Sequence, residues 1–311
     1  MICLPRDFIE TSEGLMFAVV DAVREEQRVL AFLRYVPEGS GRRKVSTVEA
    51  NVLLRDHYPQ YLHYSPRLDA HLHAVPLTDI RRQYRPRERA RTLWDKGPGD
   101  VIEAKLLQLL TKLAENGVGR ECLGVTGSLL IGRQTPRSDL DVVVYGREYF
   151  FRAREAVRRL MARGELDDLD GESWRETYDR RGCSLSFEEF FRHERRKGNK
   201  GMIDGTKFDL ALVNEDVQPE PALWRKTGQA TIRARVVDDA DIFHQPARYR
   251  LDHPEIMEAA SFTHTYVGQA QAGELIEARG VVEESGDGYK RLVVGSSREA
   301  PSEYIRVLWG E

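Results

Sequence analysis

Short runs rich in apolar and β-branched residues lie near both ends of the chain, a pattern typical of β-strands. These runs cover residues 8–11, 15–20 and 28–36 near the start, and residues 231–237, 275–282 and 289–294 near the end. A Ser12-Glu13-Gly14 turn separates the first two runs, so we expect a hairpin there. Both ends of the chain are therefore predicted to be rich in β-structure.

The middle of the chain repeats its apolar residues at helical spacing instead. Residues 102–113 carry them at i, i+4, i+7, i+8 and i+11, which forms one face of a helix that packs on a core. Asp100 is placed to cap this helix and Gly117 to end it. A second helix is predicted from about residue 147, and a Ser46-Thr47-Val48-Glu49 capping box predicts another one upstream.

Short apolar strands are interleaved with these helices, which indicates a mixed sheet. We expect the strands at 122–126, 140–145 and 207–213, the last of them after an Asp204-Gly205 hairpin turn. The stretch 58–94 is rich in Pro, His, Tyr and Arg and is expected to be irregular.

Glycine and proline divide the chain into three predicted modules. Gly97-Pro98-Gly99 marks one boundary, and Pro219 and Pro221 mark the other. The modules are a β-rich N-terminal module with a helix and a basic linker at 1–96, a central domain at 97–217, and a β-rich C-terminal domain at 218–311. The predicted fold class is α+β, with a core of mixed sheet and helices flanked by β-rich modules.

Composition and charge narrow the class of protein. The 311 residues contain 47 Lys and Arg against 50 Asp and Glu, a formal net charge of -3, so the chain as a whole is not a strongly basic nucleic-acid binder. The three cysteines, Cys3, Cys122 and Cys183, lie far apart and form neither a zinc knuckle nor a disulfide framework. The start of the chain places charges where a signal peptide needs its apolar run, and no apolar run is long enough to span a bilayer. We therefore expect a cytoplasmic protein with no membrane partner.

The most informative stretch lies between residues 124 and 144 and combines two acids with a small turn. Side chains alternate along a strand, so Asp139 and Asp141 project from one face with Cα atoms about 6–7 Å apart. Two carboxylates so placed repel each other unless positive charge lies between them, and hard divalent cations such as Mg²⁺ supply it. Gly127 and Ser128 lie between a strand and a short helix, where free N–H groups and a missing side chain let a phosphate approach closely.

This stretch resembles the active-site signature of the DNA polymerase β-like nucleotidyltransferase superfamily. That signature is a Gly-Ser pair after a strand, a spacer, and then Asp-x-Asp within an apolar strand. Gly127-Ser128, ten intervening residues and Asp139-Leu140-Asp141 match it. The match covers roughly residues 100–215, and more faintly the whole chain is similar to prokaryotic nucleotidyltransferase-domain proteins. The resemblance implies a polymerase β-like nucleotidyltransferase core, a Mg²⁺-dependent enzyme, and an NTP such as ATP as substrate.

The superfamily also uses a third acid on a neighbouring strand, and Asp209 is our candidate. Its neighbours in a short β run are apolar, and a charge in such a run is costly unless it is paired or bound to a metal. The rival Asp204 is better explained by the Asp-Gly turn, and Glu188 and Glu189 lie in a Phe-rich segment that is predicted to be helical. The resemblance implies two Mg²⁺ ions that are held by Asp139, Asp141 and Asp209.

A further group of residues is predicted to contact the nucleotide. They are Gly127, Ser128, Arg133, Arg137, Ser138 and Lys207. Many members of the superfamily have Arg-Gly where this chain has Ile131-Gly132, so we expect the triphosphate contacts to shift to Arg133 or Arg137.

The acceptor hydroxyl is less sharply defined by the sequence. An RNA 3′-end, such as a tRNA-like one, fits two basic stretches at 81–91 and 192–200, although a basic helix face and a solvated charged loop explain them as well. The stretch 192–200 could also hold a triphosphate tail in place of RNA. A protein or small-molecule hydroxyl fits the near-neutral charge, and the intact carboxylates argue against a non-enzymatic nucleotide-binding scaffold. RNA is the acceptor that we expect, whereas the base of the NTP and the oligomeric state do not follow from the sequence.

Overall fold

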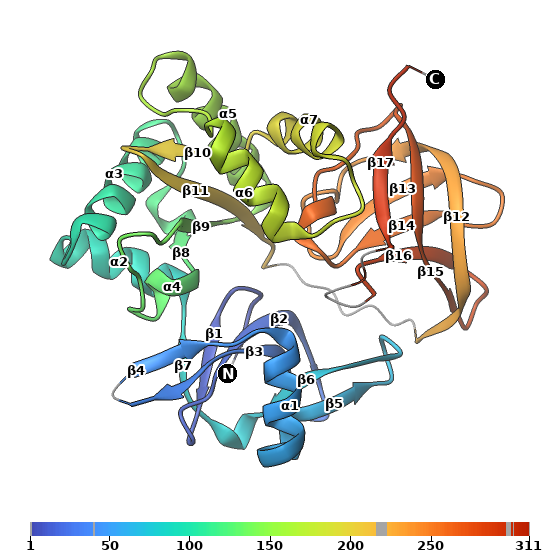
Figure 1. Ribbon diagram of the computed structural model, residues 1–311, viewed down its shortest axis with the longest axis horizontal. Coiled ribbons are helices and arrows are strands. Elements are labelled where there is room, and N and C mark those ends of the chain that lie inside the picture. Colours follow the sequence, from blue (N-terminus) through green and yellow to red (C-terminus); the bar gives the residue numbers. More distant parts are fainter. Residues whose placement is uncertain (1, 40, 216–222, 297–299, 301, 311) are drawn as a thin grey trace. The chain divides into compact units, whose positions relative to one another are not determined.

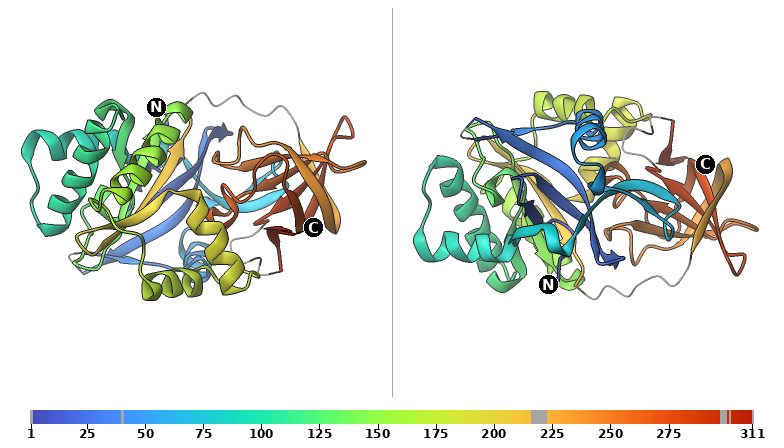
Figure 2. Two further views of the ribbon diagram at one scale, coloured as in Figure 1. Left: turned by 90° about the horizontal axis from the view of Figure 1, so that it is seen from above. Right: turned by 90° about the horizontal axis from the view of Figure 1, so that it is seen from below.

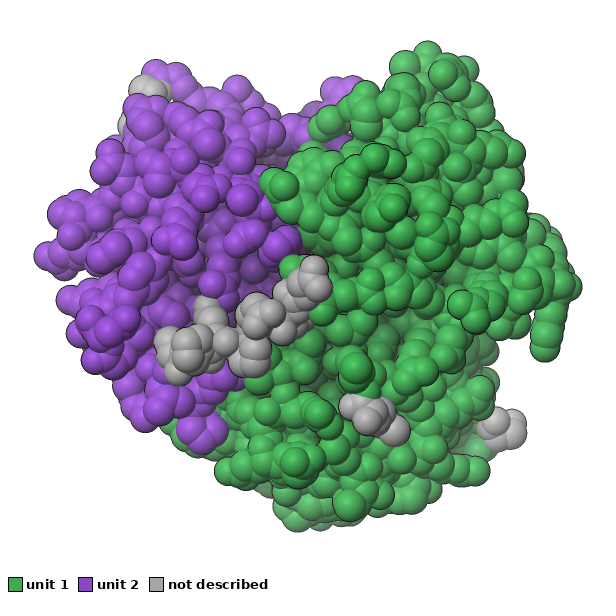
Figure 3. Space-filling view, turned by 180° about the vertical axis from the view of Figure 1, so that it is seen from behind, with its two compact units in different colours: residues 1–65, 70–168, 199–219 green, residues 66–69, 169–198, 220–311 purple. Residues whose placement is uncertain are grey.

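The computed structural model describes the chain except for residues 1, 40, 216–222, 297–299, 301 and 311 (Figures 1 and 2). The fold is α+β, and the chain divides into two compact units, which Figure 3 shows in different colours. Unit 1 comprises Met1–Ser65, Ala70–Asp168 and Asn199–Pro219, and unit 2 comprises Pro66–Asp69, Leu169–Gly198 and Glu220–Glu311. No helix in the described part of the chain is long and apolar enough to cross a membrane.

These units are divided differently from the modules expected at 1–96, 97–217 and 218–311. Residues 1–65 belong to the same unit as the central sheet, and residues 169–198 belong to the unit of the C-terminal strands. Glycine and proline mark where the chain turns, whereas the packing of apolar faces decides which segments form one body. Pro219 and Pro221, the expected second boundary, lie outside the described residues.

Unit 1 begins with a seven-stranded sheet. Its strands are β1 (Phe8–Thr11), β2 (Met16–Glu25), β3 (Arg28–Glu38), β4 (Gly41–Lys44), β5 (Leu62–Ser65), β6 (Ala70–Pro76) and β7 (Ile80–Tyr84). Their order is β5-β6-β3-β2-β1-β7, and β4 pairs with β3. One face packs on helix α1 (Thr47–His57) through residues such as Phe17, Leu33 and Leu54. The predicted hairpin, the third strand and the capping box of α1 at Ser46 are all confirmed.

The stretch 58–94 is not irregular, contrary to what its composition indicated. It contains β5, β6, β7 and helix α2 (Pro86–Lys96). Pro86 occupies the first turn of α2, where its missing N–H would have no helical partner in any case. The strands are held by pairing with β3 and β1, which come earlier in the chain. Local composition does not reveal such partners, and the prediction failed for that reason.

The central sheet of unit 1 has four strands, in the order β10-β11-β9-β8. They are β8 (Leu123–Val125), β9 (Leu140–Tyr145), β10 (Lys200–Ile203) and β11 (Thr206–Val213). Helices α3 (Val101–Glu115) and α5 (Arg147–Ala162) lie beside this sheet, and the single-turn helix α4 (Gly127–Leu130) follows β8 (Figure 1). Asp100 caps α3 as predicted, because its side chain accepts a hydrogen bond from Glu103 N.

Unit 2 combines two helices with a small β-barrel. The helices are α6 (Gly171–Arg181) and α7 (Phe187–Lys197), and the strands are β12 (Trp224–Asp238), β13 (Ala247–Asp252), β14 (Glu258–Ser261), β15 (Leu275–Ser285), β16 (Lys290–Val294) and β17 (Tyr304–Val307). Because β12 pairs with both β13 and β15, the strands β12-β13-β14-β16-β15 close into a five-stranded barrel. Its interior holds fully buried residues such as Tyr249, Ile276 and Leu292.

The basic stretch 192–200 is not a solvated loop. Residues up to Lys197 form the last turns of α7. His193 and Lys197 are buried, and Arg196 donates two hydrogen bonds to the Glu274 carboxylate. The aromatic face of α7 packs within unit 2. Part of the positive charge of this stretch is therefore buried in the unit, where acidic side chains pair with it.

Candidate active site

The parallel strands β9 and β11 bring the predicted acids together. Their register places Asp209 directly opposite Asp141. Asp139 lies two residues before Asp141 and immediately precedes β9. Side chains of in-register neighbours project from one face of a sheet, as do those at alternate positions of one strand. All three carboxylates therefore lie at one end of this strand pair.

Lysine and asparagine side chains accompany two of these carboxylates. Lys200 Nζ lies 3.4 Å from Asp209 Oδ2, and Lys207 Nζ lies 3.8 Å from Asp139 Oδ1. Asn199 Nδ2 donates a hydrogen bond of 3.1 Å to Asp209 Oδ1 and so orients that carboxylate. Sequence reasoning selected Lys207 as a site residue, and it considered Lys200 and Asn199 only as part of the basic stretch 192–200. They are beside the acid because β10 pairs with β11 and places Lys200 opposite Asp209.

The charge balance around Asp141 is set by its neighbours. Burial raises the pKa of Asp141 to about 6, and the negative charges of Asp209 and Asp139 act in the same direction. Arg6, from the segment before β1, and Lys44 of β4 oppose this rise. A bound cation stabilises the ionised form of a carboxyl group whose pKa is raised by neighbouring acids.

The chemistry of these donors fits Mg²⁺. In the described part of the chain, no group of three or more His, Cys, Asp or Glu side chains converges closely enough to hold a metal ion alone. However, Mg²⁺ usually takes one or two carboxylates and completes its shell with water and substrate phosphates. The in-register acids and the raised pKa of Asp141 agree with such a shared site. The residues that would hold the ion are Asp139, Asp141 and Asp209.

The Gly127 turn lies directly against Asp141. Thr126, the residue before it, donates a backbone hydrogen bond of 2.9 Å to Asp141 O, which ties the turn to β9. Gly127 has φ +67, and a Cβ atom at this position would overlap the Asp141 carboxylate. Glycine is therefore required here for two reasons, the backbone conformation and the lack of space beside the acid.

The remaining predicted nucleotide contacts lie in α4 and on the loop that joins it to β9. Ser128 Oγ lies 3.3 Å from Ser138 Oγ, and Ser138 Oγ accepts a hydrogen bond of 2.9 Å from Thr135 N. Arg133 N donates a hydrogen bond of 2.8 Å to Ser128 O. The side chains of Arg133 and Arg137 are exposed. The two serines thus shape the loop, and contact of the two arginines with a triphosphate remains a prediction.

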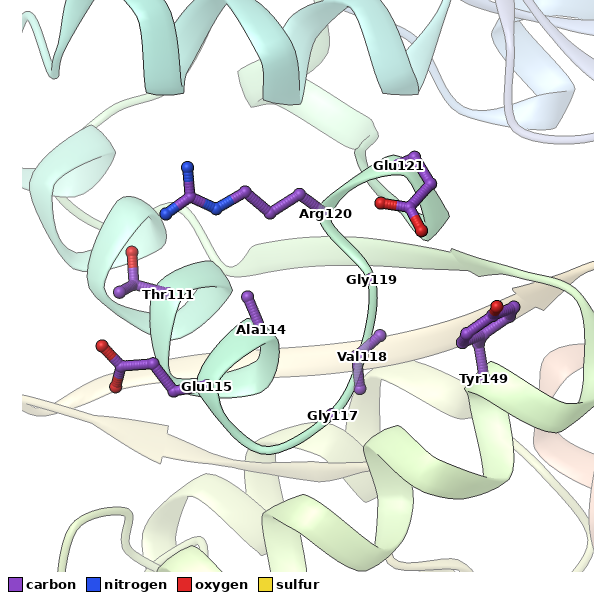
Figure 4. A pocket seen from close by; sticks show the side chains of 9 residues that line it. All are labelled: Thr111, Ala114, Glu115, Gly117, Val118, Gly119, Arg120, Glu121 and Tyr149. Atoms are coloured by element: carbon purple, nitrogen blue, oxygen red, sulfur yellow. The ribbon is translucent and has the colours of Figure 1, made fainter.

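A separate cavity of about 490 Å³ lies at the other end of β8 (Figure 4). The end of α3, the loop 117–121 and Tyr149 of α5 form it. This loop precedes β8, whereas the Gly127 turn follows it, so the cavity and the carboxylates are at opposite ends of that strand. The cavity is not the site of the predicted chemistry.

Comparison with known proteins agrees with this geometry. Residues 106–229 match the family described as nucleotidyltransferase domain. The chain is 36% identical to an uncharacterized protein of Methanocaldococcus jannaschii, MJ1086, over 97% of this chain and 98% of that protein. No solved structure matches the chain. The sequence signature, the arrangement of the acids and these matches lead to one conclusion: the chain belongs to the nucleotidyltransferase-domain family of the polymerase β-like superfamily and is a transferase of nucleotidyl groups.

Proposed function

We propose that the protein transfers a nucleoside monophosphate from an NTP, such as ATP, to the 3′-hydroxyl of an RNA, with Mg²⁺ as cofactor. One observation carries the proposal. The register of β9 and β11 gathers Asp139, Asp141 and Asp209 beside the Gly127 turn, where a side chain would overlap the Asp141 carboxylate.

In this reaction the acceptor oxygen forms a bond to the α-phosphorus and loses its proton. The bond from that phosphorus to the bridging oxygen breaks, and pyrophosphate leaves with the electron pair. Mg²⁺, when bound, lowers the pKa of the acceptor hydroxyl and neutralises charge on the phosphates. Asp139 and Asp141 would hold the nucleotide side of the site, and Asp209, oriented by Asn199, the acceptor side. The chemistry needs positioning and charge rather than a nucleophilic side chain.

The barrel of unit 2 supports an RNA acceptor. Five-stranded Greek-key barrels bind oligonucleotides on the face of their second and third strands and on adjoining loops. Here Arg248 and Arg250 lie on β13, the second strand. Burial and Glu258 raise the pKa of Tyr289, and the charges of these two arginines oppose the rise. An aromatic ring with adjacent cations is a common platform for single-stranded nucleic acid.

The two basic stretches give less support to RNA binding than the sequence indicated. Arg87 donates two hydrogen bonds of 2.6 Å to the Glu215 carboxylate, and Arg89 pairs with Glu103. RNA contacts by these arginines would have to replace existing ion pairs. The barrel face is therefore the feature of the chain that favours RNA over a protein or a small molecule.

The test is incorporation of label. The purified protein is incubated with each α-labelled NTP, Mg²⁺ and total cellular RNA, and the products are separated into RNA, protein and small molecules. Label in RNA 3′-ends supports the proposal. Label in protein or in a small molecule would mean that the acceptor is that molecule and not RNA. The absence of label from every fraction with every NTP would contradict nucleotidyl transfer.

A matched pair of variants makes the result specific. Asp141→Asn removes one of the clustered charges and should abolish incorporation. Asp204→Asn makes the same change in the β10–β11 turn, where the side chain is exposed and φ is +47, a conformation that Asn tolerates. Incorporation by Asp204→Asn should equal that of the wild type.

A further inference from the structure

The N-terminal sheet, formed by β1–β7, packs on the segment that follows the Gly127 turn. The face of the sheet opposite α1 carries Phe8, Met16 and Tyr35, and these residues form one buried cluster with Leu130 and Ile131 at the end of α4. Both faces of the sheet are thus covered, one by α1 and the other by the segment that follows Gly127. The sheet and the Gly127 turn thus lie in one compact unit.

The chain segment before β1 places Arg6 at the Gly127 turn. Arg6 has φ +81, which is uncommon for a residue with a side chain. Its backbone is held on both sides, because Arg6 O accepts a hydrogen bond of 2.8 Å from Thr126 Oγ1 and Arg6 N donates one of 3.1 Å to Val19 O. Thr126 immediately precedes Gly127. A costly conformation that is fixed against an active-site turn points to a role for the side chain.

Strand β4 supplies a second cation on the same side. Lys44 is paired with Tyr35 in the register of β3 and β4, so its side chain projects from the face that packs on α4. Arg43, the preceding residue, projects from the other face, where it pairs with Glu38 and Glu49. Lys44 therefore faces the catalytic side, and its neighbour Arg43 does not.

We propose that Arg6 and Lys44 bind the triphosphate of the NTP, so that the N-terminal sheet completes the active site. This inference rests on the proposed nucleotidyl transfer. Arg6 adjoins the Gly127 turn through its hydrogen bond with Thr126, and Lys44 projects from the sheet face that packs on α4. They would neutralise the β- and γ-phosphates and the leaving pyrophosphate, as Arg and Lys clamps do in phosphoryl transfer. The acids and the metal account for the α-phosphate, and these cations would add to the triphosphate contacts predicted for Arg133 and Arg137.

The test measures the binding of two probes by calorimetry. One probe is the Mg²⁺ complex of the NTP that the wild type binds most tightly, and the other is inorganic tripolyphosphate. Arg6→Gln and Lys44→Gln should each weaken binding of both probes by about 10-fold or more, as expected for a lost charge-assisted contact. Arg43→Gln is the matched control. It removes a cation one residue away on the opposite face and should bind both probes like the wild type.

A second variant separates binding from folding. Arg6→Gly removes the side chain and also relieves the positive φ, so it should keep or raise the thermal midpoint of unfolding while it loses triphosphate affinity. A merely structural Arg6 would leave the affinity of this variant unchanged.

The outcomes are distinguishable. Wild-type affinity in Arg6→Gln, Arg6→Gly and Lys44→Gln overturns this inference and leaves the proposed function standing. A wild-type protein that binds neither probe overturns both. Unchanged NTP affinity with a raised KM for RNA assigns the cations to the acceptor and rejects the triphosphate assignment.

Discussion

Gly127→Ala tests whether the space beside Asp141 matters in addition to the backbone conformation of the turn. Gly127 has φ +67, and a Cβ atom there would overlap the Asp141 carboxylate. Gly132 provides a control on the loop that follows the same turn. It has φ +64, and nothing lies within 4 Å of the position of its Cβ. Both alanine variants carry the left-handed backbone penalty, and only Gly127→Ala displaces the carboxylate.

The magnitudes follow from this difference. The left-handed conformation costs a residue with a side chain about 1–2 kcal/mol, so both variants should lose roughly that free energy of unfolding in urea titrations. Displacing a catalytic group by about 1 Å costs on the order of 100-fold in turnover. Nucleotide incorporation per folded molecule should therefore fall about 100-fold in Gly127→Ala and stay near the wild-type value in Gly132→Ala. Equal turnover in the two variants would show that Gly127 serves the backbone conformation alone.

Three further predictions follow from the site and from unit 2. Asp209→Asn should retain most Mg²⁺–NTP affinity but lose transfer, whereas Asp139→Asn should impair both; near-normal turnover in Asp209→Asn would remove this residue from the site. Lys197→Met removes the ammonium paired with the buried Glu194, so the free energy of unfolding should fall by about 3–5 kcal/mol with Mg²⁺–NTP affinity unchanged. A loss of affinity without a loss of stability would instead assign Lys197 to ligand binding. Burial lowers the pKa of His193 to about 3, from 6.5, so its contribution to stability is complete above pH 6.5 and is lost as the pH falls toward 3. Between pH 6 and 4 the wild type should lose roughly 1.4 kcal/mol per pH unit more than His193→Gln, and parallel stability curves would contradict this assignment.

The sequence by itself determined the elements whose rules act over a few residues. The capping box at Ser46, the cap at Asp100 and the limits of β9 were predicted because caps, turns and side-chain periodicity depend on neighbours within about one helical turn. The same locality placed Asp139 and Asp141 on one face, since alternation along a single strand is enough to do so. The family signature was visible for this reason as well, because its glycine turn and its two acids lie within one short stretch of the chain.

Only the tertiary structure decided which distant residues complete the site. The parallel register of β9 and β11 sets Asp209 opposite Asp141, and the pairing of β10 with β11 adds Lys200. The packing of the N-terminal sheet on α4 brings Tyr35 and Leu130 into one buried cluster across more than ninety residues of chain. Composition alone gives no account of such contacts, because register and face-to-face packing are fixed by the burial of whole apolar surfaces and not by the residues next in sequence.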